Sequence, residues 1–190
     1  MNLPNKLTML RMAMIPLFLV FVLIPNTLFS HTYLAALAVF AAASFTDLLD
    51  GRIARSRGLI TDFGKLMDPL ADKLLVMSAL VSFVQLTWVP GVVVVIILAR
   101  EFLVTSVRLI AAGKGTVLAA DQWGKMKTVS QMVWICYLLL SRWLMSWPQL
   151  EPGFDVMLGI HYVLMAVVVL LTLYSGYNYM VSNKQLFADA

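Results

Sequence analysis

The sequence predicts an all-α integral membrane protein, and three observations lead to this fold class. Hydrophobic residues make up 61% of the 190 residues, and the mean hydropathy is +0.87. Charged residues make up 13%, which is about half the fraction found in ordinary soluble proteins. Six apolar stretches reach or approach the length of about 20 residues that a membrane-spanning helix needs. We therefore expect a six-transmembrane-helix bundle that forms a single transmembrane domain over residues 1–190.

The predicted spans follow one another with short connections. They cover residues 8–25, 32–51, 68–86, 89–110, 127–147 and 156–180. The first span follows Leu3-Pro4-Asn5-Lys6, which suits an entry at the membrane interface with Asn5 as the N-cap. The second span ends among aspartates and the third begins among them. Because charged groups are costly in lipid, we expect those ends to face the bundle interior or water.

The basic residues predict how the spans are oriented. All but one of the 14 Lys and Arg residues fall on one side, and the exception is Arg142. Basic residues favour the cytoplasmic side, so both termini are expected there, in a multi-pass protein of the cell membrane. Trp88, Trp143 and Trp147 would lie near the opposite interface, where amphipathic rings are favoured. Anionic lipid and phosphorylated substrates account for the net charge of +4, and no nucleic-acid partner is expected.

Four aspartates stand in one frame that covers the end of the second span and the start of the third. The frame is Asp47-x2-Asp50-Gly51-x2-Ala54-Arg55 and then Gly64-x3-Asp68-x3-Asp72. At about 100° per residue, each group occupies one face of its helix, provided that the second helix continues past Gly51. Pro69 lacks a backbone donor, so the third helix is expected to begin or kink near Asp68. Antiparallel neighbours with a short connection can bring the two faces together.

The frame has the chemistry of a metal site. Four facing carboxylates repel one another, and two divalent cations would balance their charge. Ligand sets made only of oxygen suit Mg²⁺ or Mn²⁺. Two such ions clamp the attacking and leaving oxygens of a phosphoryl displacement. Gly51 and Ala54 let a bulky group approach the backbone, and Arg55 offers a planar fork for phosphate. The frame therefore predicts metal-assisted transfer from a diphosphate.

The frame resembles the signature of the CDP-alcohol phosphotransferases at all eight positions. The resemblance implies a homodimeric helix bundle in which an alcohol attacks the β-phosphorus of a CDP-linked lipid and CMP leaves. The implied metal ligands are Asp47, Asp50, Asp68 and Asp72. Asp72 would also act as the general base on the acceptor hydroxyl. The residues implied to line the CDP-lipid site are Gly51, Ala54, Arg55 and Gly64.

The rest of the chain resembles bacterial members that use glycerol 3-phosphate as acceptor and make phosphatidylglycerophosphate. The resemblance is carried by residues 2–8, by Arg100-Glu101-Phe102 with Arg108, and by residues 124–128. Arg100 and Arg108 are separated by about 80° around their helix. Together with Lys125 they can converge above the metal site and form a cationic pocket that suits an anionic acceptor. We therefore expect these three residues to bind the acceptor phosphate.

Other hypotheses stay open at this point. Within the family, the acceptor could be phosphatidylglycerol, as in a cardiolipin synthase, or an inositol phosphate or serine. A divalent-cation transporter would also combine six spans with buried acids, although its polar groups should cross both halves of the membrane. Lys127 is expected at the interface or at lipid headgroups, and Glu101 is a candidate ion-pair partner for one of the arginines. Thr8 and Arg11 could reach the headgroup or the nucleotide from the first helix.

Overall fold

The computed structural model describes residues 3–24, 31–57, 62–116, 118 and 121–187. Over these residues it contains six α-helices, two short 3-10 helices and no strand, so the predicted all-α class is confirmed. The chain divides into two compact units, which are described separately below. The first is Met1–Trp88 with Ile135–Phe154, and the second is Val89–Trp134 with Asp155–Ala190.

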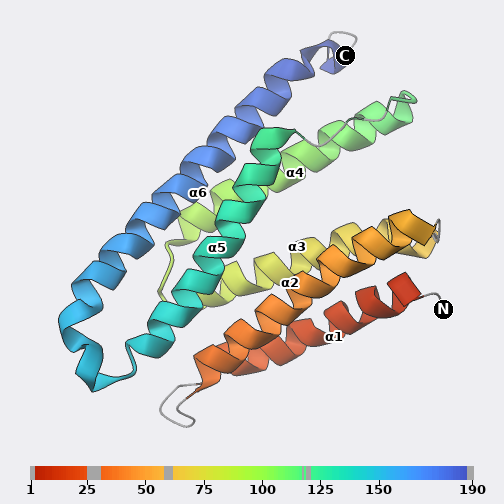
Figure 1. The fold of residues 1–190 in the computed structure, drawn as a ribbon. Helices are drawn as coiled ribbons and strands as arrows, with labels where there is room; N and C mark the ends of the chain where they lie inside the picture. The colour runs from red at the N-terminus through yellow and green to blue at the C-terminus, as the bar shows by residue number, and fades with distance from the viewer. Residues whose placement is uncertain (1–2, 25–30, 58–61, 117, 119–120, 188–190) are drawn as a thin grey trace. The chain divides into compact units, whose positions relative to one another are not determined.

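The first unit is built on three helices that run up and down. These are α1 (Leu3–Leu23), α2 (Thr32–Arg57) and α3 (Asp62–Gln85), together with the end of α5 (Gln122–Leu144) and the 3-10 helix η1 (Pro148–Gly153). Helix α1 packs against α2 and α3, which also contact each other. The start of α1, the end of α2 and the start of α3 therefore lie at one end of this unit (Figure 1). Phe18 and Phe40 pack together in its core, with ring centroids 5.9 Å apart.

The second unit contains α4 (Gly91–Gly113), the first part of α5, α6 (Phe154–Ser182) and the 3-10 helix η2 (Lys184–Phe187). Val104 and Val107 of α4 form a buried cluster with Tyr179 of α6, and Leu118 and Met180 pack against it. An apolar face of α4 is thus covered by α6 within this unit.

The helix ends near the aspartate frame differ from part of the prediction. Helix α2 continues past Gly51 to Arg57, as the one-face arrangement of the frame requires. Helix α3 begins at Asp62, well before Pro69, so the expected start near Asp68 is wrong. The proline removes only one backbone donor, and the residues on both sides of it continue the helix. Gly64, Asp68 and Asp72 therefore belong to one uninterrupted helix.

Hydropathy marks only some of the helices as membrane spans. Among the described residues, Asn5–Leu23 and Phe154–Ser182 are long and apolar enough to cross a bilayer, with hydropathies of 1.9 and 2.5. The apolar segments Thr32–Thr46 and Lys73–Gln85 are shorter. Helix α4 is apolar on average but carries Arg100, Glu101 and Arg108. The number of spans therefore stays a prediction.

Helix α3 ends in a tight backbone motif built around a threonine. The Trp88 N–H donates to the Phe83 carbonyl at 2.8 Å, and the Thr87 N–H donates to the Val84 carbonyl at 3.0 Å. These two bonds define a Schellman motif, in which the residue after the helix adopts a positive φ. Thr87 has a φ of 60°, and the Trp88 ring stacks on Phe83 at 5.4 Å. The stacking supplies the apolar contact that accompanies this motif.

Helix α4 ends in the same motif with the usual residue. The Thr116 N–H donates to the Ala111 carbonyl at 2.9 Å, and the Gly115 N–H donates to the Ala112 carbonyl at 3.0 Å. Gly115 has a φ of 74°, which glycine adopts without steric cost because it has no Cβ. The positive φ that this motif requires is therefore adopted by a glycine at the end of α4 and by a β-branched threonine at the end of α3.

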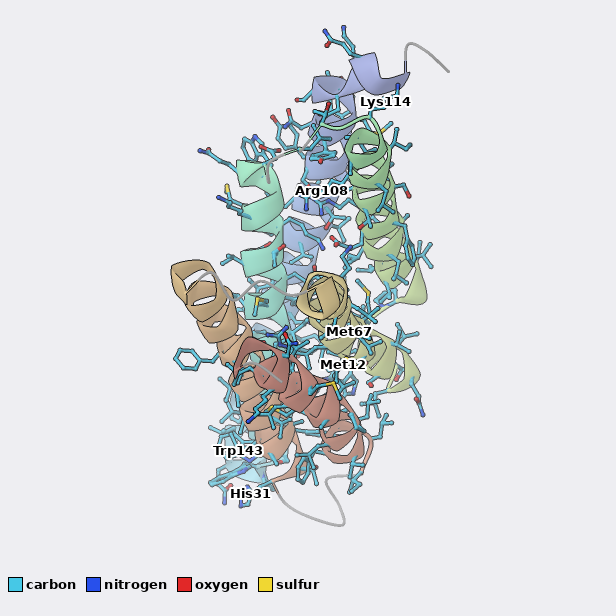
Figure 2. All side chains as sticks on the ribbon, turned by 90° about the vertical axis from the view of Figure 1, so that its right-hand side faces the viewer. Met12, His31, Met67, Arg108, Lys114 and Trp143 are labelled. Atoms are coloured by element: carbon cyan, nitrogen blue, oxygen red, sulfur yellow. The ribbon has the colours of Figure 1, made fainter. Side chains whose placement is uncertain are left out.

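Aromatic side chains gather where the sequence predicts the outer interface. Trp143 Nε1 donates to His31 Nδ1 at 3.0 Å, and these residues lie together at one end of the first unit (Figure 2). The Trp143 and Trp147 rings meet edge to face at 5.7 Å. Arg142 lies 5.0 Å from the centre of the Trp88 ring, which is a cation–π distance. The arginine predicted for the outer side is thus held against an indole.

Candidate active site

The aspartate frame is divided between two neighbouring helices of the first unit. Helix α2 carries its first five residues and α3 carries its last three. Both helices are continuous over these positions, so each group keeps the one-face arrangement expected at about 100° per residue. The end of α2 and the start of α3 lie at the same end of the unit (Figure 1). The side chains of all eight frame residues lie outside the described part of the chain, and their roles stay predictions.

Buried polar side chains follow one face of α1. Asn5, Thr8 and Arg11 are spaced three residues apart, and Arg11 is 0% exposed. The same face continues with buried Ile15 and Val22. Because α1 packs against α2 and α3, the polar part of this face belongs to the end of the unit that carries the frame. Helix α1 already includes Asn5, so the predicted N-cap role of this residue is wrong.

Arg100 is held by three helices of the second unit. Its Nε donates to Ser175 Oγ of α6 at 3.0 Å, and its Nη1 donates to Glu101 Oε1 at 2.9 Å. A Cβ added at Gly124 of α5 would lie 3.0 Å from Nη2, and one added at Gly176 of α6 would lie 3.2 Å from Cγ. Both distances are shorter than ordinary carbon contacts. The two glycines therefore form a narrow slot for the arginine side chain.

Glu101 pairs with two cations. Its Oε1 accepts hydrogen bonds from Arg100 Nη1 and from Lys127 Nζ, the latter at 2.8 Å. The predicted role of Glu101 as an ion-pair partner of an arginine is thus confirmed. Lys127 is only 2% exposed, so its predicted place among lipid headgroups is wrong. At this position on α5 the side chain turns toward α4, where the carboxylate compensates for the desolvation of the ammonium group.

Arg108 also reaches α6. Its Nε donates to Tyr179 Oη at 3.2 Å, and its Cζ lies 5.7 Å from the centre of the same ring. The Tyr179 ring is buried and packs on Val104 and Val107 of α4. Arg108 itself is exposed, so its guanidinium stays accessible beside a fixed aromatic ring.

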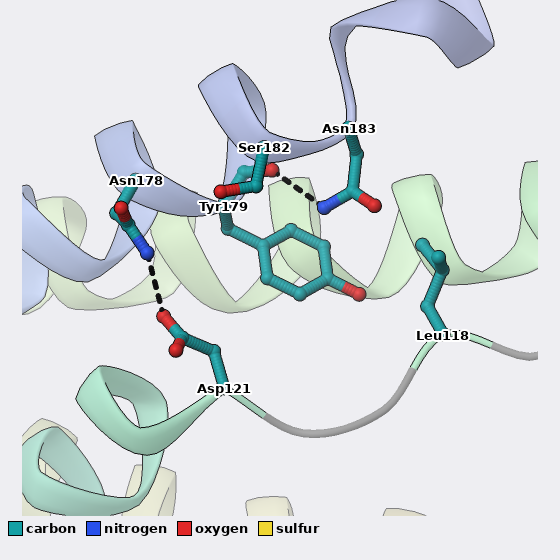
Figure 3. Close-up of a pocket in the computed structure, with 6 residues that line it drawn as sticks. All are labelled: Leu118, Asp121, Asn178, Tyr179, Ser182 and Asn183. Carbon is teal, nitrogen blue, oxygen red and sulfur yellow. Dashed lines mark hydrogen bonds between the residues drawn. The ribbon is translucent and has the colours of Figure 1, made fainter.

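A cavity of about 180 Å³ opens beside Tyr179 (Figure 3). Its lining consists of Leu118, Asp121, Asn178, Tyr179, Ser182 and Asn183. Asn178 Nδ2 donates to Asp121 Oδ2 at 2.9 Å, and Asp121 directly precedes the first residue of α5. This bond ties the start of α5 to α6 and gives the cavity a polar wall.

Lys125 lies in the first turn of α5 and is exposed. Its backbone N–H donates to the Asp121 carbonyl at 3.2 Å, and no hydrogen bond or ion pair of its side chain is seen among the described residues. It follows Gly124, which borders Arg100, so the first turn of α5 runs beside that guanidinium. Of the three residues predicted to bind the acceptor phosphate, Arg100 and Arg108 turn toward one helix, α6. Lys125 is the one whose side chain has no such contact.

No metal centre is seen among the side chains that the structure describes. No three His, Cys, Asp or Glu side chains in that set lie close enough together to hold an ion. The four aspartates of the frame are not in it. Each histidine accepts an indole N–H: His31 from Trp143, and His161 Nδ1 from Trp134 at 3.3 Å. Both imidazole rings therefore pack against the indole rings that donate to them.

The contacts that α6 makes with the two arginines were not predicted from the sequence. Ser175, Gly176 and Tyr179 contact the two predicted acceptor arginines, yet none of them was a candidate. One signal was available, because Thr172, Ser175 and Tyr179 repeat at a spacing of three to four residues in a largely apolar helix. Such a polar stripe in a membrane helix indicates a protein-facing side.

Residues 1–174 match the sequence model of the CDP-alcohol phosphatidyltransferase family. The match covers the aspartate frame and most of the chain, so this protein belongs to that family of enzymes. The family predicted from the frame is thereby confirmed.

Curated bacterial proteins are similar over nearly the whole chain. The CDP-diacylglycerol–glycerol-3-phosphate 3-phosphatidyltransferase of Bacillus subtilis is 39% identical, over 96% of this chain and 95% of its own length. The protein with that name in Rickettsia felis is 34% identical, over 98% and 97%. A probable phosphatidylglycerophosphate synthase of Mycobacterium tuberculosis is 39% identical, over 94% and 79%.

Proposed function

We propose that this protein transfers the phosphatidyl group of CDP-diacylglycerol to glycerol 3-phosphate, giving phosphatidylglycerophosphate and CMP in phospholipid biosynthesis. The observation that carries the proposal is the complete aspartate frame on two continuous, neighbouring helices of a member of this family. The choice of acceptor is supported by relatives in two bacteria whose names state this reaction and whose length this chain nearly covers.

The four aspartates of the frame would hold two divalent cations, Mg²⁺ or Mn²⁺. Their carboxylate oxygens are hard ligands of the kind these ions prefer. When bound, the ions would neutralise charge on the diphosphate during transfer. Fully buried Arg11 of α1 supports an acidic interior at this end of the unit, because a buried guanidinium needs nearby negative charge to offset its desolvation.

The frame residues would each take one part of the reaction. Asp72 takes the proton from the acceptor hydroxyl while that oxygen forms a bond to the β-phosphorus. The bond from this phosphorus to the bridging oxygen breaks, and CMP leaves with that oxygen. Gly51, Ala54 and Gly64 leave room for the nucleotide beside the backbone, and Arg55 binds phosphate through its planar fork.

Arg100, Arg108 and Lys125 would bind the phosphate of the acceptor. The guanidinium of Arg100 has five donors. Within the described residues, its Nε and one donor on Nη1 are engaged, so further donors remain for a ligand. Arg108 and Lys125 are exposed. Three cations suit glycerol 3-phosphate, whereas an acceptor without a phosphate would gain little from them.

The protein would span the cell membrane six times, with both termini and the active site on the cytoplasmic side, and would act as a homodimer. Support for the spans comes from the two long apolar helices and from the uneven placement of basic residues. An even number of spans returns the chain to the side on which it starts. A cytoplasmic site gives a soluble acceptor and a membrane-bound donor access to the same metal ions.

A panel of acceptors tests this function. Purified protein is incubated with CDP-diacylglycerol and Mg²⁺ or Mn²⁺, and CMP release is measured with glycerol 3-phosphate, phosphatidylglycerol, an inositol phosphate or serine. We expect release with glycerol 3-phosphate, loss of release with EDTA, and recovery when either ion is restored. Release only with phosphatidylglycerol would instead identify a cardiolipin synthase. No release with any acceptor would overturn the proposal.

A further inference from the structure

One buried face of α6 is polar although the helix is largely apolar. Thr172, Ser175 and Tyr179 lie on this face, and all three are buried. Thr172 and Ser175 hydroxyls donate to carbonyls of α6 itself, at 2.7 and 3.1 Å. The Ser175 hydroxyl oxygen also accepts a bond from outside the helix, as does that of Tyr179. The polar side chains of this face therefore bond to another helix as well as to α6 itself.

Each outside bond goes to a different predicted acceptor arginine. Ser175 Oγ accepts from Nε of Arg100 at 3.0 Å, and Tyr179 Oη accepts from Nε of Arg108 at 3.2 Å. In both cases the hydroxyl engages the inner nitrogen of the guanidinium. The two outer nitrogens are the pair that can bind a phosphate in fork geometry. The hydroxyls thus help set the direction of each fork. Nη1 of Arg100 also pairs with Glu101, which leaves its Nη2 and the second donor on Nη1, whereas the bond from Arg108 to Tyr179 engages only the Nε of that arginine.

The backbone of the same face adds a steric restraint. Gly176 follows Ser175, and an added Cβ there would lie 3.2 Å from Arg100 Cγ. The Tyr179 ring is held by packing with Val104 and Val107, and Figure 3 shows it leaving α6 beside the cavity. These contacts hold Ser175 and Tyr179 in place before a ligand binds. The arginines therefore hydrogen-bond to hydroxyls that do not have to become ordered on binding.

We infer that Ser175, Gly176 and Tyr179 form a positioning face that orients Arg100 and Arg108 for a phosphorylated acceptor. The inference rests on the proposed function and extends it to residues that do not touch the substrate. Ser175, Gly176 and Tyr179 all lie beyond residue 174, where the match to the family model ends. They act through the arginines, so their loss should weaken acceptor binding and leave the CDP-lipid site unchanged.

The first test removes one hydroxyl and keeps the ring. Tyr179→Phe should raise the KM for glycerol 3-phosphate about tenfold, the size expected when a hydrogen bond to a charged group is lost. The KM for CDP-diacylglycerol and kcat should stay within about twofold, because the bond acts on acceptor binding alone. Tyr177→Phe is the matched control, since Tyr177 is in the same helix but is 69% exposed. An unchanged acceptor KM in Tyr179→Phe would overturn the inference.

The second test uses glycine and needs no hydroxyl. Gly176→Ala should raise the acceptor KM because the added methyl group presses on Arg100. Gly159→Ala changes the same residue type in the same helix, at a position with nothing within 4 Å, and should leave the KM unchanged. Equal KM values in the two alanine variants would contradict a role for the slot.

Double variants separate this inference from the proposed function. Once Arg108→Ala is present, Tyr179→Phe should add no further increase in acceptor KM, because its effect passes through that arginine. A further tenfold increase would indicate a general structural role and overturn the inference. If Arg100→Ala and Arg108→Ala themselves leave the acceptor KM unchanged, the proposed acceptor site fails. If they raise it while Tyr179→Phe does not, only the positioning face fails.

Discussion

At the scale of single residues, Asp72 is predicted to do the chemistry. Asp72→Asn keeps the size of the side chain and one carbonyl oxygen but cannot accept the acceptor proton. We expect CMP release to fall by about 100-fold or more, the usual contribution of a general base. Stabilisation by Mg²⁺ in a thermal unfolding assay should survive in part, because an amide oxygen can still bind the ion.

Asp155→Asn provides the matched control for this substitution. Asp155 is an exposed acid in the first turn of α6, and its change should leave CMP release near the wild-type rate. Wild-type activity in Asp72→Asn would remove Asp72 from the role of base. Complete loss of stabilisation by Mg²⁺ would instead show that Asp72 is indispensable as a ligand.

Arg108 is predicted to recognise the acceptor phosphate. Arg108→Ala should raise the KM for glycerol 3-phosphate by about tenfold to 100-fold, since it removes hydrogen bonds from a charged donor. The KM for CDP-diacylglycerol should change much less. Steady-state kinetics with each substrate varied in turn measures both. Lys184→Ala removes another exposed cation, and an equal effect there would point to surface charge instead of a specific contact.

Residue types alone predict the chemistry of the aspartate frame, and the roles of its individual residues stay predictions. Four acids and an arginine at helical spacing indicate metal and phosphate whatever surrounds them. The place of Lys127 was not predictable, because a lysine near a membrane interface reaches either headgroups or a buried acid. Only the face that α5 turns toward Glu101 decides between these. Asn5 was misassigned for a related reason, since a capping residue type also suits a buried polar face.

At the scale of helices, the end of α3 carries local strain. A φ of 60° is unfavourable for a β-branched residue and neutral for glycine. Thr87→Gly should therefore raise the free energy of unfolding by about 1 kcal/mol. Gly115→Ala, at the same position of the motif that ends α4, should lower it by a similar amount. Thermal unfolding in one detergent measures both, and shifts in the same direction would contradict this account.

Helix positions followed from apolar content, but helix ends did not. The segment from Arg52 to about Lys65, between the second and third predicted spans, was expected to be a connection because it carries many of the polar residues. The backbone nevertheless stays helical from Asp47 to Arg57 and from Asp62 onward. Helical hydrogen bonds are satisfied within the chain in water as well as in lipid, so hydropathy sets the limits of the bilayer and not those of the helix. The prediction that the third helix begins near Asp68 was also wrong, because the single backbone donor that Pro69 lacks does not end α3.

At the scale of the whole molecule, the topology can be tested with single cysteines. Cys136 is first replaced by Ala, and a cysteine is then placed at Gln149 or at Gln185, which are both exposed. A membrane-impermeant maleimide should label Gln149→Cys in intact cells and Gln185→Cys only after permeabilisation. This pattern follows from a cytoplasmic C-terminus and an outer connection between α5 and α6. Labelling of both sites in intact cells would contradict the orientation.

The reaction class was predictable for the whole chain, and the acceptor was less so. The frame is long enough to identify the family by itself, and the match over residues 1–174 agrees. The proposed acceptor site depends on how two arginines of α4 and one lysine of α5 are directed, and spacing along one helix does not reveal that. Their partners Ser175 and Tyr179 lie some 70 residues away along the chain, a separation that helical periodicity cannot connect.

The position of Tyr179 has a consequence for how such proteins diverge. The aspartate frame lies within the shared sequence model, whereas Ser175 and Tyr179, the α6 partners of the two arginines, lie beyond its end. If Arg100 and Arg108 bind the acceptor as proposed, substitutions in the last helix are expected to change the preference for the incoming alcohol while both arginines are kept. A comparison of selectivity that stops at residue 174 would then leave out Ser175 and Tyr179.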